Sequence, residues 1–578
     1  MGLSSLYPTV KPSLSLDFAN AKTLDPRITF TRATTGTYYD GTTVKAEENL
    51  LLRSQDYSAT WTVSNLTPVT GKTAPGGTST ATEFTAGAAN GTLTQSVTAI
   101  AADYTFSVWL RRVTGTGNVD ITAHSGGTWV TQTITSTWAR YTVTQTLTAG
   151  TRTPGVRVVT SGDVVEVWGA QLEQRSAATA YTPTTTATVT SYIPRLVTAS
   201  AGVARFDHNP TTGESLGLLV EEQRANLLLR SEEIDNAAWT KSRLSITPNA
   251  TVAPDGTVTA DQLVEDTQSG THRAYQSVTK ASSAIQYTAS FYLKSAGRSF
   301  AQIRVSDTAE ANVAGVAIDL TSGTVGSTYT AGGASPFTSL SATSTNAGNG
   351  WHRLAFTFTT NTDIAVIVFA TVATSLSNTT PSYTGDGYSG IYAWGAQLEA
   401  GAFATSYIYT TTAQVTRSAD SASMTGTNFS TWYRADEGTL VLRARPYALP
   451  AASGNARLVC IDDGTINNRS VFMLGANSGN TQMTSRTSGS DQASINVASS
   501  FVVNQTVAAA GAYKADSFGF SVNGSTTGTD TSGTVPSTVT QLVIGSSAGA
   551  TERPNGTIER LAYYPFRLAN HQIQALTT

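Results

Sequence analysis

Two aromatic residues, each followed two positions later by a basic residue, occupy matching places in two similar stretches of the chain. They are Trp109 with Arg111 and Tyr292 with Lys294. Residues two apart on a β-strand point to the same face of the sheet, so each pair would present a ring and a cation together. Sugar recognition needs flat apolar rings for the C–H faces and planar polar groups for the hydroxyls. The four residues are therefore candidate carbohydrate-binding residues.

The strands that carry these pairs alternate between apolar and polar side chains. In the stretch 104–111, four apolar residues share one face, and the other face carries Thr105, Ser107, Trp109 and Arg111. We expect the apolar face to be core and the polar face to be an open sheet that a ligand can reach. The alternative is that both sheets of a sandwich bury some aromatic residues, which would make Trp109 and Tyr292 structural.

A second set of polar candidates comes from the phrase WGAQLE, which occurs at 168–173 and at 394–399. Its alternation places the tryptophan on the core face and the glutamine and glutamate on the opposite face. The candidates are Gln171, Glu173, Gln397 and Glu399, and we expect them to line the same polar sheet as the aromatic residues. The alternative role for them is a buried structural hydrogen bond or a contact between domains.

These residues do not predict catalysis. Each copy supplies one glutamate, whereas a glycosidase needs two carboxylates about 5–10 Å apart. The histidines lack the spacing of a metal site; they are His124, His208, His272, His352 and His571. We therefore expect no enzymatic activity and no cofactor. A structural calcium ion is an alternative for which the sequence identifies no ligand set, since the stretch 461–468 lacks the EF-hand spacing.

The two stretches are copies of one domain. Besides WGAQLE they share the phrase NLLLRS, at 49–54 and 226–231, and their strands follow in the same order. Each copy is far longer than a solenoid repeat, so the repeated unit is a whole domain. The second copy carries extra residues in loops rich in glycine and serine. We place the first jelly-roll sandwich at 46–190 and the second at 223–416.

The composition predicts an all-β protein of tandem jelly-roll β-sandwiches followed by a concanavalin-like sandwich. Only 13% of residues are charged, yet 22 Tyr, 18 Phe and 9 Trp exclude a disordered chain. Short strands closed by glycine turns place the concanavalin-like sandwich at 417–578. Residues 1–45 hold too little apolar material for a core and are predicted to be an attachment segment. Residues 191–222 are predicted to be an ordered connector, because they lack Gly/Ser monotony.

Charge and hydropathy exclude several partners. The net charge is −3 without a basic run, so we expect no nucleic-acid partner. The chain lacks an 18-residue apolar run and a signal peptide, so we expect no membrane insertion, and synthesis in a cytoplasm. The single cysteine, Cys460, excludes an intrachain disulfide and is expected to be a buried apolar residue.

Two further segments resemble a known group of proteins. The stretch 204–228, ARFDHNPTTGESLGLLVEEQRANLL, resembles a signature of fibre and head-spike proteins in tailed bacteriophages and gene transfer agents. The stretch 556–565, GTIERLAYYP, is similar to the end of their concanavalin-like (laminin-G type) domain, and the repeats resemble carbohydrate-binding-module jelly rolls. The resemblance implies a homo-oligomeric virion spike that is synthesised in a bacterial cytoplasm, exposed on an extracellular particle and joined to other virion proteins through residues 1–45.

These observations together predict a virion surface spike that binds host cell-surface (capsular) polysaccharide and promotes adsorption. Binding would be non-enzymatic and multivalent, since weak single sites gain avidity when several act on one particle. Two alternatives remain open, a polysaccharide depolymerase and a structural spacer or decoration protein of the particle.

Overall fold

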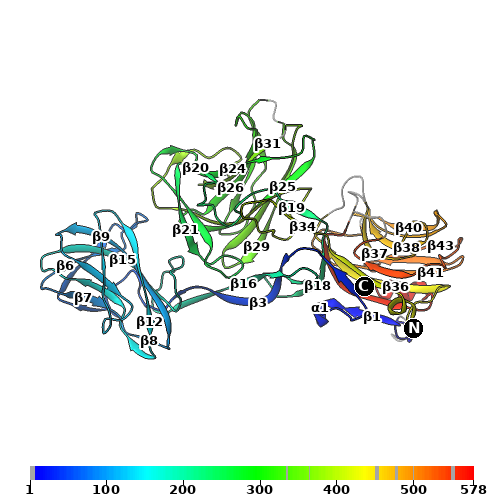
Figure 1. Cartoon of the computed structure of the whole chain (residues 1–578), viewed down its shortest axis with the longest axis horizontal. Coiled ribbons are helices and arrows are strands. Elements are labelled where there is room, and N and C mark those ends of the chain that lie inside the picture. Colours follow the sequence, from blue (N-terminus) through cyan, green and yellow to red (C-terminus); the bar gives the residue numbers. More distant parts are fainter. Residues whose placement is uncertain are drawn as a thin grey trace.

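The computed structural model describes residues 7–333, 336–363, 365–448, 455–475, 479–498, 500–547 and 553–578. The prediction of an all-β protein is confirmed. The described part contains three short helices, α1 (Phe18–Ala21), α2 (Thr427–Ser430) and α3 (Asn570–Ala575). Its named strands pair in antiparallel sheets, which form three β-sandwiches (Figure 1).

The first sandwich, which we call module 1, consists of two five-stranded sheets and lies at the left of Figure 1. One sheet has the order β12 (Ala139–Leu147), β9 (Ala102–Thr114), β15 (Val164–Glu173), β6 (Ala81–Ala86) and β5 (Leu66–Lys72). The other has the order β11 (Val130–Gln132), β10 (Val119–Thr122), β14 (Gly155–Val158), β7 (Gly91–Thr94) and β4 (Thr62–Ser64). A small pair joins β8 (Val97–Ala99) and β13 (Gly150–Arg152). Phe106, Val119 and Leu172 are fully buried between the sheets.

Module 2 repeats this plan with six strands in each sheet. Its first sheet has the order β21 (Leu244–Thr251), β22 (Ala260–Glu265), β33 (Gly390–Ala400), β25 (Gln286–Ala296), β30 (Trp351–Thr359) and β29 (Thr338–Gly348). Its second sheet has the order β20 (Thr240–Ser242), β24 (Arg273–Thr279), β31 (Ala365–Ala373), β26 (Phe300–Ser306), β27 (Val313–Asp319) and β28 (Tyr329–Ala331). A small pair joins β23 (Ser269–Gly270) and β32 (Tyr383–Thr384).

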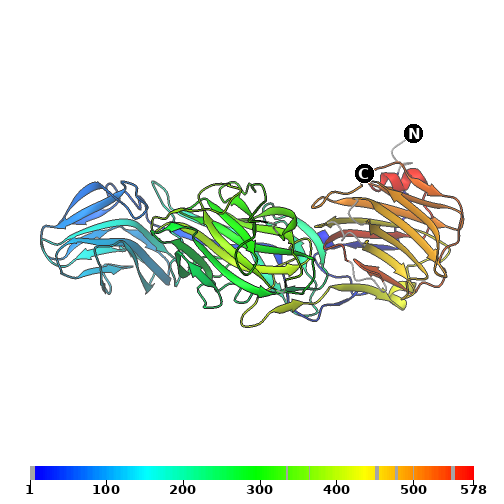
Figure 2. The same cartoon turned by 90° about the horizontal axis from the view of Figure 1, so that it is seen from above.

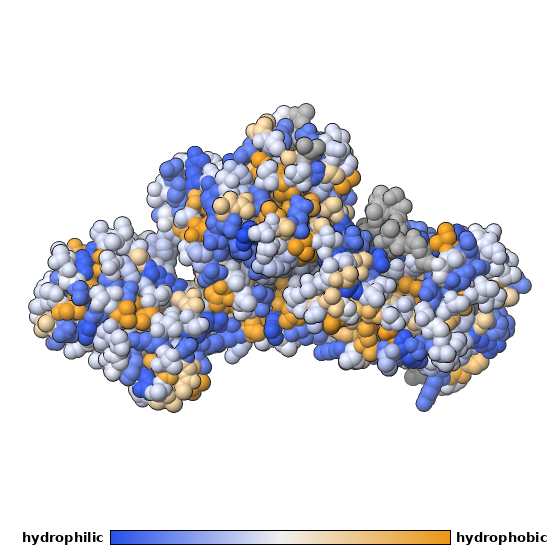
Figure 3. Space-filling view, in the orientation of Figure 1, coloured by the Kyte–Doolittle hydropathy of each residue, from blue (hydrophilic) through white to orange (hydrophobic). Residues whose placement is uncertain are grey.

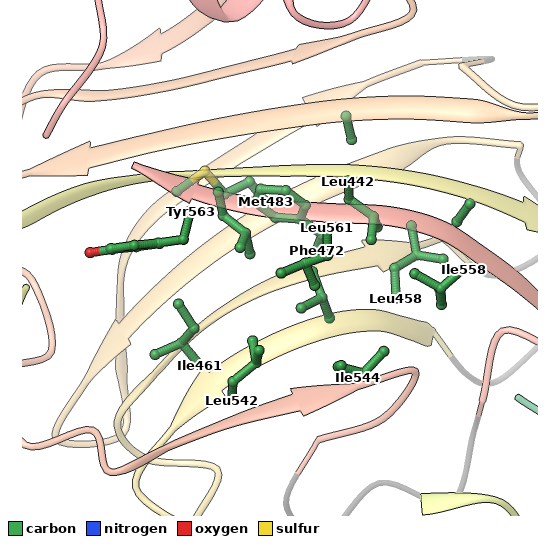
Figure 4. Close-up of a cluster of buried hydrophobic side chains, with 14 of the residues drawn as sticks. Leu442, Leu458, Ile461, Phe472, Met483, Leu542, Ile544, Ile558, Leu561 and Tyr563 are labelled. Atoms are coloured by element: carbon green, nitrogen blue, oxygen red, sulfur yellow. The ribbon is translucent and has the colours of Figure 1, made fainter. Parts of the chain in front are cut away.

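The third sandwich, the terminal sandwich, has the largest core. One sheet has the order β17 (Phe206–His208), β18 (Ser215–Val220), β45 (Gly556–Tyr564), β36 (Glu437–Pro446), β41 (Val507–Lys514), β42 (Phe518–Val522) and β43 (Gly528–Asp530), and β1 (Leu14–Asp17) also pairs with β45. The other has the order β2 (Thr29–Thr31), β35 (Ser421–Thr425), β44 (Gln541–Ile544), β37 (Ala456–Asp462), β38 (Arg469–Leu474), β39 (Thr481–Thr487) and β40 (Ser490–Val497). Leu442, Phe472 and Leu561 meet between them (Figure 4).

The order of domains along the chain differs from the predicted series of consecutive segments. Residues from the predicted attachment segment form β1 and β2, and residues from the predicted connector form β17 and β18. All four strands belong to the terminal sandwich, which is therefore assembled from three separate parts of the chain. Its core includes Leu14, Leu16 and Phe18. A segment this short cannot form a core of its own, so it buries its apolar side chains against another domain. Attachment of residues 1–45 to another protein stays a prediction.

Both modules are insertions into the terminal sandwich. A long two-stranded ribbon of β3 (Gly36–Asn49) and β16 (Val189–Ala199) leads out to module 1 and back. A short pair of β19 (Arg224–Asn226) and β34 (Val415–Arg417) does the same for module 2. The ribbon runs beneath module 2 in Figure 1, and Figure 2 shows the three sandwiches in a row. Apolar residues on the face seen in Figure 3 lie in small scattered patches.

Candidate functional site

The aromatic candidate of module 1 belongs to a cluster on the outer face of its first sheet. Trp109 of β9 lies opposite Trp168 of β15 and Arg140 of β12. The Trp109 ring centroid is 5.2 Å from that of Trp168 and 5.4 Å from that of Tyr181, and the Arg140 guanidinium lies 4.6 Å from it. Trp109, Tyr181 and Arg140 are partly exposed. The sequence paired Trp109 with Arg111 of the same strand, whereas the guanidinium that packs on the Trp109 ring belongs to Arg140 of β12, and Arg111 lies over Trp138 instead.

A glycine in the repeated WGAQLE phrase makes room for this packing. Gly169 has a φ of +64°, at a register shift between Trp168 and Gln171, and Gly395 in the second copy has a φ of +63°. A β-carbon at Gly395 would lie 2.8 Å from the ring of Tyr292. Only glycine adopts this conformation and tolerates this contact without strain, so the phrase encodes a bulge that seats the aromatic ring.

The second copy of the cluster is covered by the chain itself. Tyr292, Trp394 and Trp351 are 2%, 1% and 0% exposed, and they pack in one cluster with Ile193 and Leu196 of the ribbon. The predicted open sheet of module 2 is therefore wrong for most of its length, because the β3–β16 ribbon occupies it. The equivalent face of module 1 is not covered by the ribbon; Tyr388 of module 2 lies near it, and its rings stay partly exposed.

The two predicted cations are engaged by acidic partners. Arg111 is paired with Glu166, and its guanidinium lies 5.1 Å from the ring centroid of Trp138. Lys294 lies 2.7 Å from Glu47, a ribbon residue whose carboxylate also accepts a hydrogen bond from Asn349 at 2.5 Å. Lys294 thus fastens the ribbon to module 2.

The four glutamine and glutamate candidates are structural. All four are fully buried, and each braces the loop that follows its own strand. Glu173 accepts a hydrogen bond from the Thr179 amide at 2.9 Å, as Glu399 does from the Thr405 amide. Gln171 and Gln397 accept bonds in the same way from the amides of Thr182 and Ile408, three residues further along these loops. The expectation that they line an open sheet is wrong, and the buried hydrogen bonds weighed as the alternative are present.

A cleft of about 560 Å³, which we call the junction cleft, opens where the ribbon, the β17–β18 hairpin and module 2 meet. The ribbon contributes Tyr192 and Tyr39, and Tyr192 is 59% exposed. The hairpin and the loops of module 2 contribute amides, hydroxyls and imidazoles. These residues are Asn209, Thr211, Thr212, His208, Thr321, Ser322, Asn346, Asn349 and His352.

Two histidine side chains at the junction cleft each have one ring nitrogen that forms no hydrogen bond with the described residues. His208 donates from Nδ1 to the Tyr39 carbonyl at 3.0 Å, and its Nε2 has no partner among the described residues. This ring can approach the ribbon closely because Gly41, at a φ of +79°, has no side chain there. The Nδ1 of His352 is likewise unpaired, and burial lowers the pKa of this imidazole, which favours its neutral form. Both unpaired nitrogens are buried, so the amides and hydroxyls of the cleft are the groups that neutral hydroxyls can reach.

A second cleft of about 540 Å³ continues from the first and shares Tyr39, His208 and Asn346 with it. It extends between module 2 and the terminal sandwich, where Tyr292, Arg353, Arg445 and Tyr447 line it. Asp207 borders it too, and burial raises the pKa of its carboxyl to about 6. Tyr292 is thus the one candidate predicted from the sequence that borders either of the two clefts. The local sequence gives no sign that Tyr192 or His208 converge, because they lie on different strands.

The structure also describes the possible metal ligands, the surroundings of the cysteine and the lengths of the helices. Within the described ranges no group of three or more His, Cys, Asp or Glu side chains could hold a metal ion. Cys460 is fully buried as an unbridged thiol, and burial raises its pKa well above the usual value. Helices long and apolar enough to cross a bilayer are absent from the part of the chain that the structure describes.

One acidic residue beside the buried cluster of module 2 predicts a pH effect. Burial raises the pKa of Glu232 to about 7, and the carboxylate accepts a hydrogen bond from Tyr407 at 3.0 Å. The unfolded chain ionises this group more readily, so the free energy of unfolding should fall by about 1–3 kcal/mol as the pH rises from about 4.5 to 8. Glu232→Gln, which copies Gln55 at the equivalent place in module 1, should make this decline shallower in denaturant titrations. An unchanged decline in the variant would refute the assignment.

Comparisons with known proteins give the following result. No family model matches the chain, and no curated protein matches it. The CBM40 module of a Ruminococcus gnavus sialidase, solved with α2,3-sialyllactose, is 18% identical over 26% of this chain and 88% of that chain, with a TM-score of 0.23. The tandem CBM22 domains of Paenibacillus barcinonensis Xyn10C are 14% identical over 62% and 99%, with a TM-score of 0.19. Domains LG4–5 of the mouse laminin α1 chain are 8% identical over 50% and 87%, with a TM-score of 0.18.

Proposed function

We propose that this chain binds carbohydrate without cleaving it, and that the junction cleft is the binding site. The observation that carries the proposal is the exposed Tyr192 ring beside fixed amide and imidazole groups in a cleft of about 560 Å³. Ligand pockets are about 300–1,000 Å³ in volume and combine apolar surface with a few placed polar groups. The junction cleft meets both requirements.

The side chains of the cleft suit a neutral sugar. Tyr192 offers a flat ring for the C–H face of a pyranose, while Asn346 and Asn209 offer both donors and acceptors to hydroxyls. Parts of both amides are already bonded to nearby backbone, which fixes their orientation before a ligand arrives. A preorganised site loses less conformational entropy on binding.

The biological setting we propose is the surface of a phage-like particle that contacts the capsular polysaccharide of a host cell. The support is the resemblance of residues 204–228 to virion spike proteins, and this stretch includes His208, Asn209 and Thr211 of the cleft. A single shallow site binds weakly, so a homo-oligomer displayed in several copies would supply the avidity that adsorption needs.

The test of this function is retention of the purified full chain on immobilised capsular polysaccharide, with an assay of reducing ends on the same mixture. We expect retention that free polysaccharide reverses, with no rise in reducing ends. Release of reducing ends would favour the depolymerase. Absence of retention on every capsular and envelope polysaccharide tried would favour the structural spacer.

A substitution in module 1 separates its aromatic cluster from the junction cleft. Trp109→Ala should change polysaccharide affinity by less than about twofold, because Arg140 lies over the ring and Trp168 and Tyr181 pack against it. It should lower the free energy of unfolding by about 2 kcal/mol, since a partly buried indole is removed. Titration calorimetry and denaturant unfolding measure the two effects. A large loss of affinity at unchanged stability would move the binding site to module 1.

A further inference from the structure

Two arginines lie over one phenylalanine ring on the outer face of the second sheet of module 2. Arg273 of β24 and Arg304 of β26 flank Phe369 of β31, with guanidinium carbons 4.9 and 5.0 Å from its ring centroid. The residues that alternate with them, such as Ile303 and Val368, belong to the core of the module. The two guanidinium groups therefore lie on the side of the sheet away from that core.

This outer face is covered rather than open. Arg304 is 2% exposed and Gln302 is fully buried, and Gln302 donates hydrogen bonds to the carbonyls of Ser377 and Thr379, both at 3.1 Å. The loop that carries these carbonyls thus lies over Gln302, and Tyr329 of β28, whose hydroxyl donates to Gln302 at 3.0 Å, lies beside Arg304. Arg273 and Glu310, whose side chains are 18% and 30% exposed, form the edge through which solvent reaches the site.

The charges at this site do not balance. Arg273 is paired with Glu310 through two contacts of 2.5 and 3.1 Å. Arg304 forms no ion pair with any residue in the described ranges, and its Nε and Nη1 atoms have no hydrogen-bond partner there. The Nε of Arg273 and the hydroxyl of Thr371 are buried and unpaired as well. The unpaired groups of this face can donate, and Arg304 has no ion-pair partner of its own: its nearest acidic group, Glu310, is paired with Arg273, and its other polar neighbour is the hydroxyl of Tyr329.

Burial of an arginine charge lowers the free energy of unfolding unless an anion lies beside it. A guanidinium stays protonated in proteins, and an uncompensated charge in a buried place is destabilising. Burial lowers the pKa of Arg304 and the nearby Arg273 charge lowers it further, while Tyr329 and Glu310 only partly offset this shift. Planar oxyanions match the forked donors of arginine, as Glu310 already does on Arg273.

Module 1 offers a matched comparison on its equivalent sheet. There Arg157 of β14 lies 4.8 Å from the ring centroid of Trp129 and donates to Asp120 of β10 at 2.9 and 2.6 Å. Thr131 completes that group by donating to the other Asp120 oxygen at 2.8 Å. Module 1 therefore contains a carboxylate paired with its stacked arginine, whereas the carboxylate near Arg304 in module 2, that of Glu310, is paired with Arg273.

We propose that module 2 binds an oxyanion, a carboxylate or sulfate group, between Arg304, Arg273 and Thr371. Thr371 pairs in register with Arg273 and lies diagonally across from Arg304, so donors from three adjacent strands converge on one place. The group belongs either to a free anion or to an acidic saccharide. The strands that carry this site belong to the second sheet of module 2, whereas β29 and β30, which border the junction cleft, belong to the first. The existence of the oxyanion site therefore does not depend on the function proposed above.

The test uses the full chain, with sodium sulfate and sodium glucuronate compared against sodium chloride at equal ionic strength. Both oxyanions should raise the unfolding temperature, and calorimetry should give saturable binding that Arg304→Gln weakens at least about tenfold. Without oxyanion, Arg304→Gln should unfold no earlier than the parent, because an unpaired buried charge has been removed. The control, Arg157→Gln, should keep the full oxyanion response.

The measured affinities distinguish a free anion from an acidic saccharide and show whether the proposed site binds an oxyanion. Binding of glucuronate at least about tenfold tighter than that of sulfate assigns the group to an acidic saccharide, and comparable binding assigns it to a free anion. An oxyanion response no greater than that of chloride overturns the proposal, and so does an undiminished response in Arg304→Gln. Should that variant fail to fold, Thr371→Val decides in its place, with binding weakened at least about threefold expected and unchanged binding contradicting the site.

Discussion

Tyr192→Ala should weaken the binding of a polysaccharide fragment at least about tenfold, which corresponds to about 1.4 kcal/mol. The side chain is 59% exposed at the edge of the junction cleft, so it supports little of the fold and is available to a ligand. Loss of its ring removes the one highly exposed aromatic surface of that cleft, while the amides and imidazoles remain. Calorimetry with a short oligosaccharide measures this effect without avidity.

The control for this substitution is Tyr409→Ala. Tyr409 is a tyrosine of similar exposure, 48%, and it lines neither of the two clefts. We expect its replacement to leave affinity unchanged, and both variants to unfold within about 0.5 kcal/mol of the parent. Equal affinities for Tyr192→Ala and the parent would place the sugar elsewhere, with the second cleft and its Tyr292 the next candidate.

Arg205→Met should lower the free energy of unfolding by about 3–5 kcal/mol, the largest effect on stability that we expect. Arg205 is fully buried and lies 2.6 Å from Asp420 and 2.7 Å from Glu221. Arg32 pairs with the same aspartate at 3.1 Å, and Arg417 with the same glutamate at 2.9 Å. Removal of Arg205 would leave two buried carboxylates with one guanidinium each.

This charge network occupies the place where the chain enters and leaves both modules. Along the chain, Arg32 and Arg205 lie before and after the segment that forms the ribbon and module 1. Glu221 and Arg417 lie before and after module 2 in the same way. Burial alone would raise the pKa of Glu221, but Arg417 and Arg205 hold it at about 2. Because that pKa lies below its value in the unfolded chain, the stability from this group is present above about pH 4.5 and is lost as the pH falls towards 2.

An exposed ion pair supplies the control for the network. Arg53 lies 2.7 Å from Asp56, with side chains 32% and 52% exposed, so Arg53→Met should cost less than about 1 kcal/mol. Denaturant unfolding measures both variants. A cost at Arg205 no larger than that at Arg53 would contradict a stabilising role for the network. We also expect Arg205→Met to weaken polysaccharide binding, because the ribbon would be less firmly held.

Patterns within single strands were sufficient to predict the fold class. Alternation in the stretch 104–111 correctly placed Phe106 and Val108 in the core and Trp109 on the other face. Alternation did not identify the role of Gln171 and Glu173, although it put them on the correct face. Their partners are backbone groups of the following loop, and strand periodicity carries no information about whether a loop folds back over the sheet.

The sequence by itself determined that the chain is all-β, that one domain occurs twice, and which face is apolar in strands without a bulge. These properties depend on residues close together along the chain, whose periodicity follows from strand geometry. In WGAQLE the bulge turns Trp168 and Trp394 to the outer face, so the prediction that they face the core is wrong. Only the tertiary structure decided that the terminal sandwich takes strands from three parts of the chain, that the ribbon covers the aromatic cluster of module 2, and that Tyr192, His208 and Asn346 line one cleft. Those outcomes depend on packing between surfaces that are distant along the chain. The two modules share a local pattern, and they differ in the segments that the rest of the chain places against them.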